Sequence, residues 1–274
     1  MFTLEQIQEG IVLPLDKPRQ WTSFQAVNKV KAVVRNRYGL KKFKIGHAGT
    51  LDPLATGLLL VCLGKATKTI PLLQDGDKVY TGTMVLGATT PCYDMERAID
   101  HYYPYSHITP ELLDEKRQLF EGEIKQVPPM FSAVKIDGQR AYEYARINED
   151  GGTRPEELKA RTVKVYSFEI TDFREGESTE GGVRRSELLL SHQGDSEPQT
   201  HLYDNPQCVI PAHLPQVDFR IHCGKGTYIR SIARDLGLVL GSGAFLSALR
   251  REQIGSYTLD HAITLDQVES YLVD

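Results

Sequence analysis

Asp52 is the one acidic residue between positions 44 and 68, and it lies in a glycine-rich loop, GHAGTLDP (residues 46–53). Glycine adopts backbone conformations that other residues avoid and lets a ligand approach the main chain closely. Pro53 pushes Asp52 toward extended geometry, so the backbone fixes where the carboxylate lies. A single acidic group held beside a core strand is what a rigid active site requires. The alternative is that Asp52 caps a turn before proline.

The segments on either side of this loop are expected to position the carboxylate. Residues 57–63, GLLLVCL, have the length and composition of a strand that is buried on both faces. Before the loop we expect a helix, capped by Thr22 or Ser23 and ended by Gly39, with apolar residues at three- and four-residue spacing. The opposite face of this helix carries lysine and arginine, so one element would serve both the core and a basic surface.

Local signals predict the other elements. A capping box formed by Thr3 and Gln6 opens a short helix, and Thr109-Pro110 begins a helix that Gly122 ends. Segments rich in alternating and β-branched residues predict strands over residues 10–15, 78–86, 161–173 and 217–223. Helical patterns cover residues 66–73, 228–240 and 264–272.

The bulk composition is that of a soluble globular protein. The chain has 274 residues, of which 41% are hydrophobic and 25% are charged. No apolar run approaches the roughly 20 residues that span a bilayer, and the N-terminus lacks the pattern of a secretory signal. The four cysteines form no CxxC pair and do not lie with histidines at metal-binding spacing. We therefore expect a cytoplasmic protein with reduced thiols and no metal site.

Positive charge is concentrated in two segments, although the net charge is −4. Residues 28–68 contain nine lysines or arginines and one acid, and residues 220–251 contain six and one acid. A basic face on an acidic body can bind phosphates, because the local field governs the encounter. The alternative for each cluster is a solvated face that keeps the chain soluble.

Residues 46–59, GHAGTLDPLATGLL, resemble the GHxGxLDPxAxGxL signature of the TruB family of tRNA pseudouridine synthases. Many consecutive fixed positions match, so this signal is far more specific than a short glycine pattern. Further blocks follow in the order of the family: LDKP at residues 15–18, KVY at 78–80, PPMFSAVK at 128–135, YEYAR at 142–146 and KGTYIR at 225–230.

The resemblance implies an α/β pseudouridine synthase fold, with a curved, mixed, largely antiparallel sheet flanked by helices. A thumb-like segment of about residues 128–160 would close on RNA, and an acidic segment of about residues 174–216 interrupts the likeness. The acidic segment is rich in Gly, Ser, Pro and Gln, which suits an excursion between two strands. We expect one catalytic domain over residues 1–274, without the C-terminal RNA-binding PUA domain that many bacterial members carry.

The resemblance also assigns candidate site residues. Asp52 would be the catalytic nucleophile, attacking either C1′ of the ribose or the base. Arg230 would pair with this aspartate, and Tyr80 would stack on a flipped uracil and assist the catalysis. The substrate-binding residues that the resemblance implies are His47, Tyr228, Leu249 and Lys17.

Without the resemblance, several of these residues could have a different role. Arg230 could be a phosphate clamp or half of a surface ion pair. Tyr80 and Leu249 could be core residues, because aromatic and aliphatic side chains on strands are more often buried than functional. His47 could be a structural hydrogen-bonding residue, and Lys17 could either contact phosphate or be purely structural.

The implied reaction needs no helper molecule. Isomerising uridine breaks the C1′–N1 bond, turns the uracil and rejoins it through C5, with no redox change. The sequence therefore implies no cofactor, and the site must exclude water, which would hydrolyse the intermediate. The expected partner is tRNA, whose T-loop uridine at position 55 would be flipped from its stack. We expect the chain to act as a monomer and not to associate with a membrane.

Two other functions stay open on the sequence alone. A nucleoside or glycosidic hydrolase would use Asp52 together with a second acid such as Asp94, and it would release free uracil. A non-enzymatic RNA chaperone would unfold and refold the tRNA elbow, and Asp52→Asn would leave its function intact. An intact aspartate motif is unnecessary for binding alone, which favours the synthase.

Overall fold

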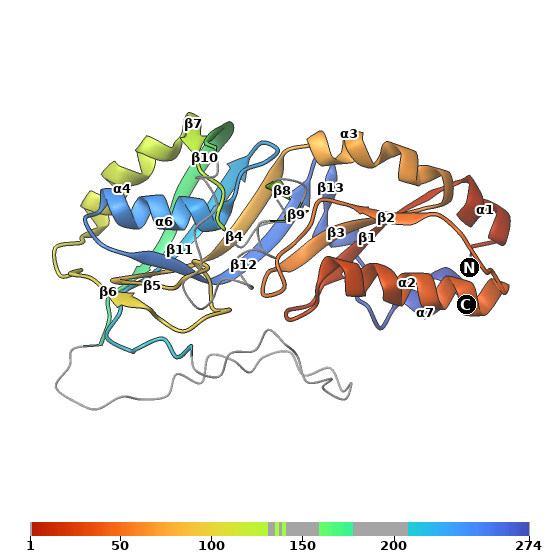
Figure 1. Cartoon of the computed structure of the whole chain (residues 1–274), viewed down its shortest axis with the longest axis horizontal. Helices are drawn as coiled ribbons and strands as arrows, with labels where there is room; N and C mark the ends of the chain where they lie inside the picture. Colours follow the sequence, from red (N-terminus) through yellow and green to blue (C-terminus); the bar gives the residue numbers. More distant parts are fainter. Residues whose placement is uncertain (1, 131–134, 137–138, 141–158, 178–207, 274) are drawn as a thin grey trace. The chain divides into compact units, whose positions relative to one another are not determined.

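The computed structural model describes residues 2–130, 135–136, 139–140, 159–177 and 208–273. The chain forms two compact units: the first contains Met1–Thr81 and Leu249–Asp274, and the second contains Gly82–Ala248. Strands β4 (Lys78–Leu86) and β12 (Ala244–Ile254) contribute residues to both units. Figure 1 labels the helices and strands.

The strands of the first unit gather around β3 (Thr56–Leu63). β1 (Ile11–Lys17) and β2 (Ile45–Ala48) both pair with β3 in the antiparallel sense. β12 pairs with β3 in parallel, and β13 (Tyr257–Thr258) pairs with β12 in the antiparallel sense. β3 is therefore hydrogen-bonded along both edges.

Helices cover both faces of this sheet. α2 (Ser23–Tyr38) and α7 (Val268–Val273) pack on one face with α1 (Leu4–Glu9). A 3₁₀ turn, η1 (Gly64–Thr69), leads into α3 (Ile70–Asp75), which packs on the other face with η3 (Leu259–His261). The predicted capping box at Thr3 is present, and of the two residues predicted to cap α2 it is Thr22 that does so, in a capping box with Gln25. Gly39 ends α2 in the left-handed conformation that glycine adopts without strain.

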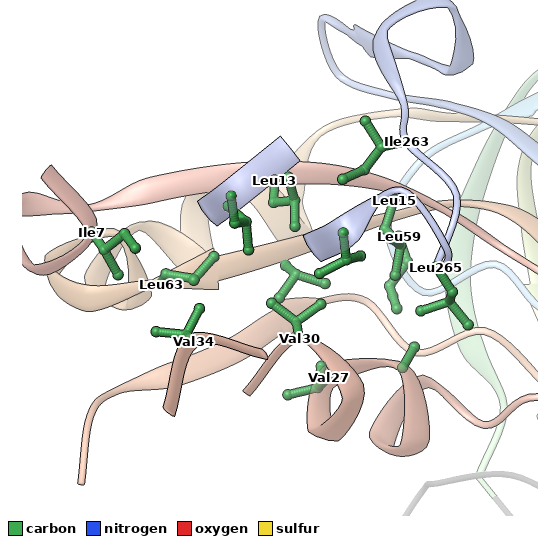
Figure 2. Packing of buried hydrophobic residues seen from close by; sticks show 14 residues of the cluster. Ile7, Leu13, Leu15, Val27, Val30, Val34, Leu59, Leu63, Ile263 and Leu265 are labelled. Carbon is green, nitrogen blue, oxygen red and sulfur yellow. The ribbon is translucent and has the colours of Figure 1, made fainter. Parts of the chain in front are cut away.

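β3 is buried on both faces, as its sequence predicts. Leu59, Val61 and Leu63 belong to the cluster that packs against α2 and α7, which Figure 2 shows from close by. Leu58 and Leu60 pack on the opposite face with residues of β2 and α3. The loop that precedes β3 is thus anchored to a strand that water does not reach.

In the second unit the strands lie in the order β12-β4-β11-β10-β7. The central strand of the antiparallel part is β10 (Arg161–Arg174), with β11 (Gln216–Cys223) on one side and β7 (Gly122–Gln126) on the other. Two short antiparallel pairs lie apart from this sheet: β5 (Ala88–Thr89) with β6 (His101–Tyr102), and β8 (Lys135–Ile136) with β9 (Gln139–Arg140).

The helices described in the second unit are α4 (Pro110–Arg117), η2 (Gln118–Phe120) and α6 (Ile229–Val239). Phe168 of β10 meets Phe120 and Phe219 edge-on, with ring centroids 6.4 Å and 6.2 Å apart. Edge-to-face pairs of this kind add to the free energy gained by burial. They tie the η2 turn to the sheet.

The predicted α/β class with a mixed, largely antiparallel sheet is confirmed. The helix predicted to run from Thr109 to Gly122 is α4, which the 3₁₀ turn η2 extends to Phe120; Gly122, with a φ of +87°, begins β7 two residues later. The guanidinium of Arg117 donates to the carbonyl oxygen of Phe168 at 2.6 Å, and Phe120 packs edge-on against the Phe168 ring. The end of this helical segment is thereby held against β10.

Two predicted segments fall largely outside the described residues. Of the thumb-like segment, residues 131–134, 137–138 and 141–158 are not described, and of the acidic segment, residues 178–207 are not. The expectation of one catalytic domain stays a prediction. In the part of the chain that the structure describes, no helix is long and apolar enough to cross a membrane.

Candidate active site

Asp52 lies in the loop between β2 and β3, residues 49–55, which we call the aspartate loop. The carbonyl oxygen of Asp52 accepts a hydrogen bond from the amide of Ala55 at 3.1 Å, which closes a turn with Pro53 in its second position. The side chain of Asp52 is half-buried. A backbone turn, and not a helix face, displays the carboxylate, as the sequence predicts.

Ser23, the first residue of α2, holds Leu51 immediately before the aspartate. Its hydroxyl accepts a hydrogen bond from Leu51 N at 2.9 Å and donates one to Leu51 O at 3.2 Å. Ser23 and Leu51 are both buried. The capping box at Thr22 fixes where α2 begins, and it therefore also fixes the residue before Asp52.

Lys17, the last residue of β1, holds Pro53 immediately after the aspartate. Its side chain is fully buried, and its Nζ donates to the carbonyl oxygens of Pro18 (2.9 Å), Trp21 (2.7 Å) and Pro53 (3.2 Å). An ammonium group has three N–H donors, and these carbonyls accept all of them. This geometry favours a loop-shaping role for Lys17 over a phosphate contact.

Burial lowers the pKa of Lys17 from 10.5 to about 7. The charge of Asp52 opposes this effect by raising the pKa, Arg251 lowers it further, and Asp16 raises it. The pKa of Lys17 therefore depends on two charged groups near the aspartate loop, the carboxylate of Asp52 and the buried guanidinium of Arg251.

That second cation, Arg251 of β12, is a residue that the sequence analysis missed. It is 2% exposed, and its guanidinium donates to Leu58 O at 2.8 Å and to Gly49 O at 3.0 Å. These acceptors are 193 and 202 residues away in the sequence, so no local pattern pointed to them. The one available signal was the pair Arg250-Arg251, because successive side chains on a strand point to opposite faces.

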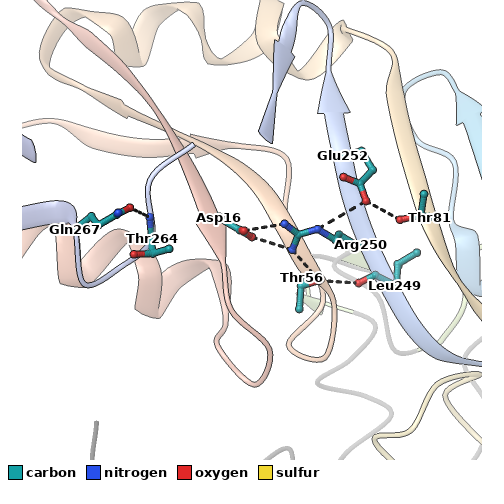
Figure 3. A network of polar contacts seen from close by, with 8 residues as sticks. All are labelled: Asp16, Thr56, Thr81, Leu249, Arg250, Glu252, Thr264 and Gln267. Carbon is teal, nitrogen blue, oxygen red and sulfur yellow. Dashed lines mark hydrogen bonds and ion pairs between the residues drawn. The ribbon is translucent and has the colours of Figure 1, made fainter. Parts of the chain in front are cut away.

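Arg250 points the other way and makes a different set of contacts, drawn in Figure 3. It donates to the two carboxylate oxygens of Asp16 at 3.1 Å and 2.8 Å. It also lies near Glu252, whose carboxylate accepts from Thr81 at 2.7 Å. This network links β1, β4 and β12 without reaching Gly49.

Two predicted site residues lie on the long strands of the first unit. Tyr80 lies on β4 and is 9% exposed. Leu249 lies on β12 and is half-buried, and its carbonyl oxygen accepts from Thr56 Oγ1 at 3.4 Å (Figure 3). Since Thr56 follows the aspartate loop directly, Leu249 lies beside the place where that loop enters β3.

His47 lies on β2, two residues before the aspartate loop, and is half-buried. Burial lowers the pKa of His47, and the charge of Arg251 lowers it further. Both effects favour the neutral imidazole at physiological pH.

Arg230 belongs to α6 in the second unit and is 3% exposed. Its Nη1 donates to Cys92 O at 3.2 Å, and its Nε lies 3.7 Å from Oδ2 of Asp94, which is itself 7% exposed. A buried charge is retained when a countercharge lies beside it. Asp94, considered above only as a second acid of a hydrolase, is one such countercharge for Arg230.

Tyr228 is the residue at which α6 begins, and a buried glutamine fixes its backbone. Gln126 accepts from Tyr228 N at 2.8 Å and donates to Tyr228 O at 3.1 Å, so one side chain makes both hydrogen bonds of a strand partner. The next residue, Val127, accepts at its carbonyl from Ser231 and Arg234. The end of β7 is thereby clamped to the first turns of α6.

The predicted site residues fall into two groups. Lys17, His47, Asp52, Tyr80 and Leu249 belong to the first unit, where Lys17 is tied directly to the aspartate loop. The others, Tyr228 and Arg230, belong to the second unit and share the start of α6.

Among the described residues, no group of three or more His, Cys, Asp or Glu side chains could hold a metal ion. The four cysteines are free and buried. Burial raises the pKa of Cys62 to about 11, so this thiol stays protonated at neutral pH and is a poor nucleophile. Cys62 is therefore not a candidate nucleophile.

Two family models match the chain. One, described as "TruB family pseudouridylate synthase (N terminal domain)", matches residues 35–186. The other, described as "tRNA pseudouridylate synthase B C-terminal domain", matches residues 230–274. The first match spans more than half of the chain and contains the aspartate loop.

A curated protein of Flavobacterium johnsoniae named tRNA pseudouridine synthase B is 45% identical over 271 residues, which are 98% of this chain and 99% of that protein. A crystal structure of a Cbf5-Nop10-Gar1 complex matches with a TM-score of 0.59 and 29% identity, over 99% of this chain. A structure of an H/ACA RNP bound to a substrate RNA containing 2′-deoxyuridine matches with a TM-score of 0.56 and 27% identity, over 98% of this chain. This chain spans only 59% and 56% of those two solved chains.

Proposed function

Because the chain belongs to the TruB family of pseudouridine synthases, we propose that it isomerises the T-loop uridine at position 55 of tRNA to pseudouridine. The proposed reaction breaks the C1′–N1 bond and forms a C1′–C5 bond. The hydrogen on C5 leaves as a proton and N1 gains one, so atoms and electrons balance without an oxidant or a cofactor. One nucleophile and a site that excludes water are sufficient.

The observation that carries this proposal is the way in which the aspartate loop is held. Leu51 and Pro53, the residues on either side of Asp52, are each fixed by a buried polar side chain, Ser23 and Lys17. A turn closed by Ala55 adds a third constraint. A rigid, half-buried carboxylate is pre-organised for attack on C1′ of the ribose or on the base, because little motion is needed to bring it into line.

Arg230 and Tyr80 complete the proposed catalytic set, on the strength of the family motifs. Arg230 is buried beside Asp94, and we propose it also as a countercharge for the half-buried carboxylate of Asp52. Tyr80 offers an aromatic face on which a flipped uracil can stack. His47, Tyr228, Leu249 and Lys17 are proposed to shape the pocket and hold the displaced bases.

The partner in this proposal is tRNA, held by its T-arm. The basic residues of the segment 28–68 supply the positive field that a phosphate backbone requires. The protein would act in the cytoplasm as a monomer, without a metal or a cofactor. The likeness to the RNA-bound H/ACA structure supports an RNA substrate.

A single incubation tests the proposal. An unmodified tRNA transcript is treated with the protein, and pseudouridine is mapped by carbodiimide labelling and reverse transcription. We expect one new pseudouridine, at position 55, and none in a transcript with cytidine at that position. Pseudouridine at another position would preserve the reaction class and refute the proposed target.

The same incubation separates the two other readings. Free uracil with no pseudouridine would indicate a hydrolase. Tight tRNA binding with neither product would indicate a chaperone, and Asp52→Asn would then leave every activity in place.

A further inference from the structure

Arg251 reaches from β12 to both ends of the aspartate loop. Its Nη2 donates to the carbonyl oxygen of Gly49, the first residue of the loop, at 3.0 Å. Its Nε donates to Leu58 O at 2.8 Å, three residues beyond the end of the loop. One rigid guanidinium therefore sets the distance between the two points from which the loop departs.

The backbone of Arg251 is fixed at the same place. Arg251 is the parallel partner of Gly57 on β3. Gly57 has a φ of +99°, and a Cβ atom there would lie 2.3 Å from Arg251 O, so only glycine allows the two strands to approach this closely. The side chain and the main chain of Arg251 thus hold the same short stretch of β3.

The positive charge of Arg251 also acts on residues near the aspartate loop. Arg251 is 2% exposed, and its field lowers the pKa values of Lys17 and His47, two residues that border the aspartate loop. The carbonyl oxygens of Gly49 and Leu58 carry no formal charge, so these two hydrogen bonds do not neutralise the guanidinium. Arg251 therefore contributes hydrogen bonds and positive charge to this part of the structure in addition to packing.

We propose that Arg251 is the positioning residue of the aspartate loop, which holds Asp52 in line for the reaction proposed above; the inference rests on that proposed function. Arg251 acts through the loop and does not itself touch the reacting atoms. A misplacement of about 1 Å at a reacting group can slow a reaction about 10²-fold. Loss of the two-point contact should therefore lower the rate of the chemical step more than the affinity for RNA.

The test compares Arg251→Lys with its neighbour Arg250→Lys in the full chain. Lysine keeps the charge but lacks the rigid fork of N–H donors that holds Gly49 O and Leu58 O at a fixed spacing. Arg251→Lys should therefore lower the single-turnover rate about 10²-fold and change the Kd for tRNA by less than about threefold. Arg250→Lys removes from the same strand a guanidinium whose contacts with Asp16, Glu252 and Thr56 lie outside the aspartate loop. It should stay within about threefold of the wild-type rate, because the ion pair with Asp16 is partly open to solvent and its lysine variant keeps the charge.

Two measurements that need no RNA complete the test. In Arg251→Lys, the amides of residues 49–55 should exchange with deuterium faster than in the wild type, while those of α2 stay protected. In Arg251→Gln, the pKa of His47, followed by NMR, should rise, and in Arg251→Lys it should stay low. If Arg251 had a purely structural role, hydrogen exchange would not increase in the aspartate loop alone, and the pKa of His47 would not differ between Arg251→Gln and Arg251→Lys.

Each possible result either supports or overturns the role proposed for Arg251. A wild-type rate in Arg251→Lys, or unchanged exchange of the aspartate loop, would overturn the inference. Failure of Arg251→Lys, Arg251→Gln and Arg251→Met to fold would also overturn it, because Arg251 would then hold the whole first unit. A wild-type protein without synthase activity would refute the proposed function alone, since exchange and the His47 titration still report on the loop.

Discussion

Asp52 is flanked by two residues whose main chains carry the contacts that fix it. Ser23 binds Leu51 at both its amide and its carbonyl, and Lys17 binds the carbonyl of Pro53. Hydrogen bonds to the backbone leave a side chain available for chemistry. The aspartate could be predicted from sequence because its motif is continuous, whereas Arg251 could not, because its contacts are with residues about two hundred positions away.

Replacing the carboxylate by its amide should separate catalysis from folding. We expect Asp52→Asn to lower the single-turnover rate of pseudouridine formation by more than about 10³-fold, as is usual when a nucleophile is removed. The substitution keeps the shape of the side chain, so the midpoint of thermal unfolding and the Kd for tRNA should change little. Calorimetry and filter binding measure these two quantities, and a parallel fall in affinity would mean that Asp52 is mainly a binding residue.

Lys17 should make the stability of the protein depend on pH. Its pKa is lowered from 10.5 to about 7 in the folded chain, so between these values the unfolded chain binds more protons than the folded one. The free energy of unfolding contributed by this group therefore rises with pH across the window from about 7 to about 10.5. Below pH 7 the folded chain carries the cost of a buried ammonium group.

Urea unfolding of the wild type and of Lys17→Met, at intervals from pH 6.5 to pH 9.5, checks this expectation. The wild type should gain stability relative to Lys17→Met as the pH rises. A difference that stays constant over the range would show that Lys17 keeps its proton in the folded protein.

At the scale of elements, signals that lie within a few residues predicted the structure well. The cap at Thr22 marks where α2 begins, and the apolar spacing of α2 marks the face that packs on the sheet, so both signals lie within the segment itself. The glycine signal at Gly122 predicted the end of the segment formed by α4 and η2 to within two residues, but it did not predict the change from α-helix to 3₁₀ turn after Arg117. Likewise, the helix predicted over residues 66–73 divides into η1 and α3.

Gln126 is a buried side chain that helps to hold the joint between the end of β7 and the start of α6, together with the contacts of Val127 O. Gln126 is 2% exposed and satisfies both the amide and the carbonyl of Tyr228. A glutamine ahead of two prolines gave no hint of this role, because its partner lies 102 residues later. Since α6 carries Arg230 in its first turn, the joint also orients a proposed catalytic residue.

Gln126→Leu should lower the free energy of unfolding by about 1–3 kcal/mol, because the buried polar groups of Tyr228 lose their partner. The amide of Tyr228 should lose its protection against hydrogen exchange. Gln118→Leu is the matched control, since Gln118 is exposed and its substitution should cost less than about 0.5 kcal/mol. Urea unfolding and exchange NMR measure both effects, and equal costs in the two variants would contradict the role given to Gln126.

At the scale of the whole molecule, the net charge of −4 hides a strongly uneven distribution. Lys29 and Arg35 are exposed on α2, within the basic segment 28–68. Such a surface attracts a phosphate backbone even when the total charge is negative. The overall balance of charge therefore predicts solubility better than it predicts the partner.

Removing Lys29 and Arg35 together, as alanines, should weaken tRNA binding and make it less sensitive to salt. The slope of log Kd against log salt concentration should fall by about 0.7–0.9 for each side chain that contacts a phosphate. Lys116→Ala, on α4 beside Glu115, should leave this slope unchanged. Titrations at several salt concentrations measure it, and an unchanged slope in the double variant would exclude α2 from the RNA-binding surface.

The two ends of the chain build the first unit together, and this has a consequence for how the protein is made. Arg251 lies 202 residues after Gly49, so the ribosome adds it long after the aspartate loop has been synthesised. Until then β3 lacks its parallel neighbour, and pairings between such distant segments form late. A nascent chain that ends before position 249 would contain the whole aspartate loop but would lack Arg251 and the part of β12 that pairs with β3, so we expect its aspartate loop to be unfixed.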